Sequence, residues 1–258
     1  LFRNPLAGPF VLGISSGASL GAALLIFGGG MLASTTLALN DTALALASSA
    51  GSFAVLLVVL GVSTRLKDSM ALLIIGLMFG SITAALVTVL SFFSEAEVLQ
   101  QYIFWSYGSV GNLGWGTLAV LAGICLGGVL LSLFSLKALN ALLLGEAYAG
   151  TLGFSLPRLR LFIILATGLL AGGITAFAGP IAFIGLAVPH LARLLFKSSD
   201  HRVLLPAVLL CGAILMLLCD TVAQLPSSAY VLPINAITSV VGAPIVIWLL
   251  LRRKKLLF

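Results

Sequence analysis

Long apolar runs alternate with short polar segments along the whole chain. Eight runs suit helices across a bilayer, at about 10–29, 43–63, 70–92, 116–136, 160–177, 179–196, 203–223 and 234–251. A helix needs about 20 residues to cross roughly 30 Å of hydrocarbon, and it satisfies its own backbone hydrogen bonds in lipid. The pattern therefore predicts an all-α, polytopic membrane protein with about eight transmembrane helices.

Composition supports this class. The chain has 258 residues, of which 61% are hydrophobic and 8% charged, too apolar for one water-soluble core. Its net charge of +6 comes from basic residues scattered between apolar runs, which argues against nucleic acid as a partner. Cys125, Cys211 and Cys219 lie within apolar runs without metal-ligand spacing. We expect buried, reduced thiols, no metal site and no cofactor.

The basic residues also predict an orientation. With the start of the chain in the cytoplasm, every Lys and Arg falls on or near the cytoplasmic side, as the positive-inside rule requires; these are Arg3, Arg65, Lys67, Lys137, Arg158, Arg160, Arg193, Lys197, Arg202, Arg252, Arg253, Lys254 and Lys255. The other side receives Asp41, Glu95, Glu97 and, near a helix end, Asp220. This assignment predicts a cytoplasmic C-terminus and a cytoplasmic loop at 137–160.

The segment Leu136–Arg160 has the composition of a docking element. It reads LKALNALLLGEAYAGTLGFSLPRLR and has basic residues at its edges. Small residues surround its one carboxylate, Glu146, which would let a short helix-turn-helix lie in a shallow groove on another protein. We predict that this cytoplasmic loop contacts a partner.

Two stretches are less regular. Residues 95–115 are too short and too aromatic for a full span, and suit a short helix at the outer interface; an ordinary aromatic belt without a gating role is the alternative. Residues 6–10 (LAGPF) and 177–181 (FAGPI) form a weak repeat at the start of spans of opposite direction. Such a repeat is typical of inverted-topology transporters, although so short a match can arise by chance.

Few polar residues are candidates for chemistry within the spans. Ser15, Ser16, Gly17 and Ser19 lie in the first turns of a span; they suit either close helix packing or a loosely polar pathway lining, and we favour the lining. His190 beside Pro189 fits a kinked helix better than a metal site. His201 is most simply a residue of a solvated loop.

Missing motifs exclude several classes. The sequence has no GxxxxGK[ST] phosphate loop and no constellation for hydrolysis, so we expect that the chain does not hydrolyse ATP by that route and is not an enzyme. Apart from Asp220 and Arg193 near span ends, no charged residue lies within the spans, which argues against a proton-coupled carrier. A docking loop in a chain that has no ATP-binding motif implies a separate ATPase subunit.

Five segments together resemble the FecCD-type permeases, the membrane subunits of binding-protein-dependent ABC importers for ferric siderophores, haem and vitamin B12. The segments are RNPLAGPFVLGISSGASLGAAL at 3–24, LLLGEAYAGTLG at 142–153, AGPIAFIGLAVPHLARLL at 178–195, DHRVLLPAVLLCGAILMLLCDTVAQ at 200–224 and ITSVVGAPIVIWLLLRR at 237–253. They occur in the family's order and span essentially the whole chain.

The resemblance implies one permease domain over 1–258, of a ten-helix type that lacks its first two helices here. It implies a multi-pass protein of the bacterial cytoplasmic (inner) membrane that works as a homodimer, or beside a sister permease, with the path at the dimer interface. Its other partners would be a cytoplasmic ABC ATPase and a periplasmic or lipid-anchored binding protein.

The family's motifs also imply roles for individual residues. Residues of the loop would couple to the ATPase: Leu144, Gly145, Glu146, Ala147, Gly150 and Gly153. Ser15, Ser16, Gly17 and Ser19 would line the pathway, and Lys67, Asp68 and Ser69 match the inner gate by position only. The sequence departs from the family at Gln224, where members often carry an Arg that docks the binding protein.

The resemblance predicts alternating access, with affinity for an iron chelate, haem or corrinoid residing largely in the binding protein. Two other classes stay open. A secondary carrier or channel would move its solute without an ATPase. A membrane scaffold would bind partners and transport nothing.

Overall fold

The computed structural model describes residues 13–31, 41–65, 69–111, 113–224 and 231–254. Every regular element in these ranges is a helix, which confirms the predicted all-α class. Five helices are long and apolar enough to cross a membrane, and three shorter apolar helices start at Ile14, Ile184 and Ile234. The eight together correspond to the eight predicted runs.

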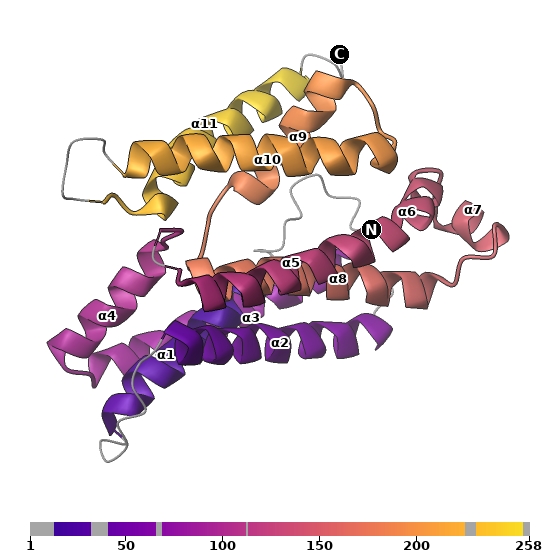
Figure 1. Cartoon of the computed structure of the whole chain (residues 1–258). Coiled ribbons are helices and arrows are strands. Elements are labelled where there is room, and N and C mark those ends of the chain that lie inside the picture. Colours follow the sequence, from indigo (N-terminus) through magenta and orange to yellow (C-terminus); the bar gives the residue numbers. More distant parts are fainter. Residues whose placement is uncertain (1–12, 32–40, 66–68, 112, 225–230, 255–258) are drawn as a thin grey trace. The chain divides into compact units, whose positions relative to one another are not determined.

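Contacts divide the chain into two compact units, which we describe separately. Unit 1 comprises residues 1–106 and 111–180, and unit 2 comprises 107–110 and 181–258. The helices of unit 1 are α1 (Ile14–Met31), α2 (Asp41–Arg65), α3 (Ser69–Phe92), α4 (Ala96–Tyr107, whose last residue falls in unit 2), α5 (Trp115–Phe134), α6 (Leu136–Leu143), α7 (Glu146–Thr151) and α8 (Leu156–Ala178) (Figure 1).

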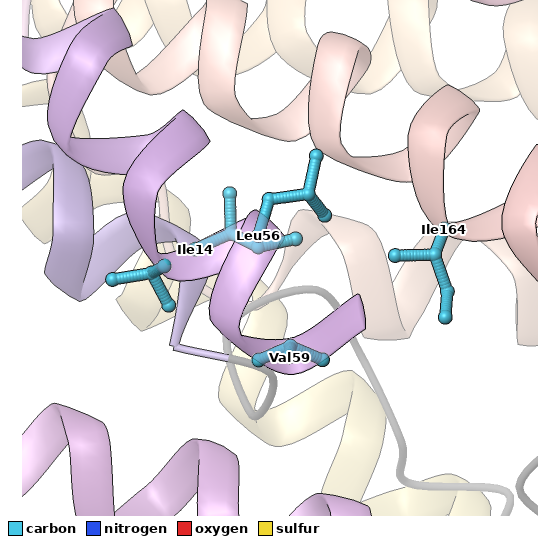
Figure 2. Packing of buried hydrophobic residues seen from close by; sticks show 5 residues of the cluster. Ile14, Leu56, Val59 and Ile164 are labelled. Carbon is cyan, nitrogen blue, oxygen red and sulfur yellow. The ribbon is translucent and has the colours of Figure 1, made fainter. Parts of the chain in front are cut away.

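Helix α1 packs against α2, α3 and α8 within unit 1. Figure 2 shows part of this core, with Ile14 of α1, Leu56 and Val59 of α2, and Ile164 of α8. Each of these four side chains is at most 1% exposed. Ser52 of α2 donates a hydrogen bond to the carbonyl of Ile14 (3.1 Å). Apolar packing and a buried hydrogen bond therefore join α1 to α2.

Small residues bring α1 and α2 close together. A Cβ atom on Gly17 would lie 2.5 Å from the carbonyl oxygen of Gly51, and one on Gly21 would meet the backbone of Ala47. Helices without side-chain bulk at their contact can bring their backbones together, which is how membrane helices gain van der Waals contact. The glycines of α1 are thus packing residues in unit 1.

The predicted interfacial segment forms the short helix α4 (Ala96–Tyr107), which buries none of its residues fully. Its Tyr102 ring lies 5.2 Å from that of Phe27 on α1, centroid to centroid. A short helix between residues 95 and 115 is therefore confirmed. Its place at the outer membrane surface stays a prediction.

Unit 2 contains α9 (Ile184–Phe196), α10 (His201–Ala223) and α11 (Ile234–Lys254), which pack against one another pairwise. Asp200 starts α10, because its carboxylate accepts a hydrogen bond from the backbone N–H of Arg202 (2.9 Å). Ile234 of α11 packs against Cys219 and Ala223 of α10. Contacts between small and branched side chains therefore hold the helices of unit 2 together.

The cysteines are reduced, as predicted: all three are free thiols. Their predicted burial is only partly right. Cys219 is buried, whereas Cys125 and Cys211 are only half-buried, because α5 and α10 keep broad apolar faces uncovered within their units. Such faces suit lipid or a second subunit.

Candidate functional site

The predicted docking segment folds into two short helices before α8. Helix α6 ends at Leu143, Gly145 turns the chain with φ 110°, and α7 covers Glu146–Thr151. Gly153 follows with φ 83°, and α8 begins at Leu156 with Pro157 in its first turn. Both glycines have positive φ, which other residues adopt only with strain. Glycine is therefore required at both turns that flank α7.

Apolar side chains on this segment are left uncovered. Leu144 is 68% exposed, Tyr148 48% and Leu152 54%, while Ala149 of α7 is fully buried. The predicted coupling residues Ala147, Gly150 and Gly153 are also exposed. We call these three side chains, Leu144, Tyr148 and Leu152, the apolar surface of the loop. Their burial by a partner would stabilise the complex, because it removes apolar surface from water.

Glu146 forms an ion pair with Arg160 of the same chain. Arg160 Nη2 of α8 lies 3.0 Å from Glu146 Oε1 and 3.2 Å from Oε2. This contact is an ion pair between α7 and α8. Both residues belong to the predicted loop, and the sequence alone does not pair them, because a separation of 14 residues across a turn leaves their geometry open.

The predicted pathway residues lie at contacts between helices of unit 1. The Ser15 and Thr175 hydroxyl oxygens are 3.4 Å apart, which joins α1 to α8. Ser19 donates a hydrogen bond to the carbonyl of Ser15 (3.1 Å). Ser16 and Gly17 face the neighbouring helices α3 and α2. Packing thus accounts for these contacts, and the lining of a pathway stays a prediction.

Two predicted features fall largely outside the described residues. Lys67 and Asp68 of the inner gate are not described, and Ser69 is the first residue of α3. The first copy of the weak repeat, at 6–10, is likewise not described. The gate and the repeat therefore stay predictions.

The prediction of one continuous helix over 179–196 is wrong, because α9 begins only at Ile184. Gly179 ends α8 with φ 75°, and the helix resumes only at Ile184, after Phe183 in the left-handed conformation (φ 62°). Pro180 cannot donate a backbone hydrogen bond and Gly179 adopts positive φ easily, so Gly-Pro was the available signal for this break.

A side chain from α11 supports the broken segment within unit 2. Asn235 Oδ1 accepts a hydrogen bond from the backbone N–H of Ala182 (3.1 Å). A Cβ atom on Gly242 would lie 2.5 Å from that of Phe183, so a glycine is needed there. These supports were not visible in the sequence, because they join residues about fifty positions apart.

The Gln224 side chain forms a hydrogen bond with Asp220, one helical turn earlier on α10. Its amide Nε2 donates to Asp220 Oδ2 at 2.6 Å. The neutral amide carries no positive charge that could pair with a carboxylate of a binding protein. The departure from the family pattern at this position is therefore a real chemical difference.

Comparison with known proteins places these elements in a family. The sequence profile of the FecCD transport family matches residues 1–252. The chain is 39% identical over 260 residues to the vitamin B12 import system permease protein BtuC of Salmonella paratyphi A, covering 98% of this chain and 75% of that protein. It is also 39% identical over 262 residues to the protein of the same name from Klebsiella pneumoniae, covering 98% and 74%.

A solved structure agrees with these relatives. It is described as an inward-facing conformation of a metal-chelate type ABC transporter, and matches with a TM-score of 0.85 at 33% identity. The match covers 97% of this chain and 78% of the other. The chain therefore belongs to the FecCD transport family, as the sequence motifs predicted.

Proposed function

We propose that the chain is the permease subunit of a binding-protein-dependent ABC importer for a corrinoid or an iron chelate, including haem. The observation that carries this proposal is the match to vitamin B12 permeases along 98% of the chain. The solved metal-chelate transporter, matched over 97% of the chain, supports the same substrate range. Residues 1–258 would form one permease domain in the bacterial cytoplasmic membrane, with the C-terminus inside.

The loop at 137–160 is the proposed contact with a cytoplasmic ATPase. Three properties support this assignment: a short helix between two glycine turns, the exposed apolar surface of the loop, and the basic residues around it. The coupling residues would be Leu144, Gly145, Glu146, Ala147, Gly150 and Gly153. Closure of the ATPase pair on ATP would move α7 and reorient the helices behind it.

The remaining parts of the mechanism follow the family. Two permease subunits, identical or related, would enclose the pathway, and a periplasmic or lipid-anchored binding protein would deliver the substrate. Ser15, Ser16, Gly17 and Ser19 would line the path, and Lys67, Asp68 and Ser69 would form the inner gate. Because such small residues offer few strong contacts, affinity would reside in the binding protein.

The decisive experiment reconstitutes the permease in proteoliposomes with its ATPase and binding protein. Uptake of radiolabelled cobalamin, ferric siderophores and haem is then followed with and without ATP. Accumulation that requires both ATP and the binding protein is the expected result. Uptake that follows an ion gradient and ignores ATP would favour a secondary carrier instead, and a complex that moves no solute would favour a scaffold.

Cross-linking tests the contact with the ATPase directly. A cysteine at Tyr148, on the exposed side of α7, should form a cross-link to the ATPase in membrane vesicles. A cysteine at Glu97, exposed on α4, should form none, because we place it on the outer side. The three native cysteines lie in apolar helices and provide a low background. Equal cross-linking from both positions would contradict the assignment.

Charge reversal at the loop tests its role in transport. We expect Glu146→Arg to abolish ATP-dependent uptake while leaving membrane insertion intact, because two cations would then face each other at the start of α7. ATP-dependent substrate uptake into membrane vesicles measures the loss of transport. Immunoblotting of the same membranes measures the amount of inserted permease. Normal uptake by the variant would contradict the coupling assignment.

A further inference from the structure

The ion pair between Glu146 and Arg160 joins the start of α7 to the first turns of α8. Both carboxylate oxygens of Glu146 accept from the same nitrogen, at 3.0 and 3.2 Å. The Arg160 side chain is 20% exposed and that of Glu146 is 37% exposed. The carboxylate is therefore engaged by Arg160 within the chain, with each of its oxygens accepting from the Arg160 nitrogen.

The position of the pair along α7 matters. The helix has six residues, too few for stability on its own. Its C-terminal end is tied to α8 covalently, through the turn at Gly153, where Phe154 N–H also bonds the carbonyl of Ala149 (3.2 Å). Its N-terminal end is tied to α8 by the ion pair. These two attachments at opposite ends, together with the packing of α7 on α6, restrain α7 from pivoting about the turn.

Helix α8 carries any movement of α7 into the core of unit 1. It contacts α1, α2 and α5, and it places Ile164 in the buried cluster of Figure 2. Thr175, near its other end, lies 3.4 Å from Ser15 of α1, hydroxyl to hydroxyl. A rigid connection from α7 to α8 would therefore reach α1, the helix of the proposed pathway.

We propose that Arg160 is a positioning residue for coupling, and that Glu146 acts through Arg160 and not by contact with the ATPase. The pair makes α7 and the start of α8 move as one body. This inference rests on the proposed function, since it specifies how that loop transmits movement. The apolar surface of the loop would supply the contact with the ATPase itself.

The test uses the complete complex in proteoliposomes and measures two rates, cobalamin uptake and ATP hydrolysis. Arg160→Gln should lower cobalamin uptake per ATP hydrolysed by about 1.4- to 5-fold, the range that corresponds to losing one partly exposed pair of about 0.2–1 kcal/mol. ATP hydrolysis and complex assembly should stay at the wild-type level. Arg158→Gln is the matched control, because Arg158 is exposed in the same turn of α8 and its replacement removes the same charge.

Exchange of the two charges separates the inference from direct contact. Glu146→Arg combined with Arg160→Glu restores the pair with reversed polarity at unchanged net charge. We expect this double variant to recover uptake per ATP to within about two-fold of wild type, since the coupling energy belongs to the pair. A double variant as defective as Glu146→Arg alone would overturn the inference and show that Glu146 touches the partner.

Hydrogen exchange provides a readout that does not depend on transport. Arg160→Gln should speed amide exchange over residues 146–151 while leaving α8 beyond Ile164 unchanged, and Arg158→Gln should change neither. Unaltered exchange in α7 would overturn the positioning role even in a complex that transports normally. If the wild-type complex moves no solute, the proposed function fails, and this measurement still decides whether the pair holds α7.

Discussion

The contact between α1 and α2 predicts that Gly17→Ala destabilises the protein. A Cβ atom there would lie 2.5 Å from the Gly51 carbonyl oxygen and 2.7 Å from a methyl carbon of Val55, whereas real Cβ contacts essentially never fall under 3.0 Å. The nearest atom belongs to the backbone and cannot rotate away. The two helices must therefore separate by at least about 0.5 Å.

The magnitude follows from two opposing effects. Overpacking of this kind costs about 1–3 kcal/mol, and we expect the upper end because a gap of 0.5–1 Å forfeits about a quarter to a half of each dispersion contact along the interface. Alanine gains about 1 kcal/mol over glycine as a helix former. The free energy of unfolding should therefore fall by about 2 kcal/mol, or roughly 4–8 °C in melting temperature at this chain length.

Gly29→Ala is the matched control, because Gly29 lies in the same helix and a Cβ atom added to it would have nothing within 4 Å. This variant should be neutral or slightly more stable. Thermal unfolding of the purified permease in detergent, followed by circular dichroism, measures both. A Gly17→Ala protein that melts at or above the temperature of Gly29→Ala would refute the close packing of α1 on α2.

Two further predictions concern the broken segment before α9. Gly242→Ala should lower the melting temperature, because its Cβ would lie 2.5 Å from that of Phe183, while Gly212→Ala, whose nearest neighbour is 3.7 Å away, should not. Asn235→Ala should cost about 1–3 kcal/mol by leaving the Ala182 N–H without its partner, as measured by thermal unfolding. Asn235→Asp keeps an acceptor and should lose less; equal losses in both would contradict the role of the hydrogen bond.

The helices could be predicted from the sequence because length and hydrophobicity are local properties. Each of the eight apolar runs corresponds to an apolar helix, and the short aromatic segment forms α4. The break at 179–183 was missed because the residues around it are as apolar as a helix. Only Gly179-Pro180 marked it, and the left-handed Phe183 depends on space that Gly242 provides.

The candidate site was predictable in position but not in geometry. Small residues around one carboxylate marked the loop, and the two glycine turns with positive φ explain why those residues occur there. That Arg160 pairs with Glu146 could not be predicted, because the pairing depends on how the chain turns at Gly153. The serines of α1 show the opposite limit, because their pattern suited both packing and a pathway, the sequence favoured the pathway, and in unit 1 they make packing contacts.

Unit 1 combines a tightly packed core with a short, lightly buried helix, α7. Around α1, glycines and buried branched side chains leave little room for one helix to slide without the next. Helix α7, in contrast, has one buried residue, two glycine turns and a partly exposed ion pair. Elements that move in function are drawn from the less stable parts of a fold. A partner bound to α7 would therefore meet a lightly buried element, and the ion pair with Arg160 would pass its movement on to the packed helices of the core.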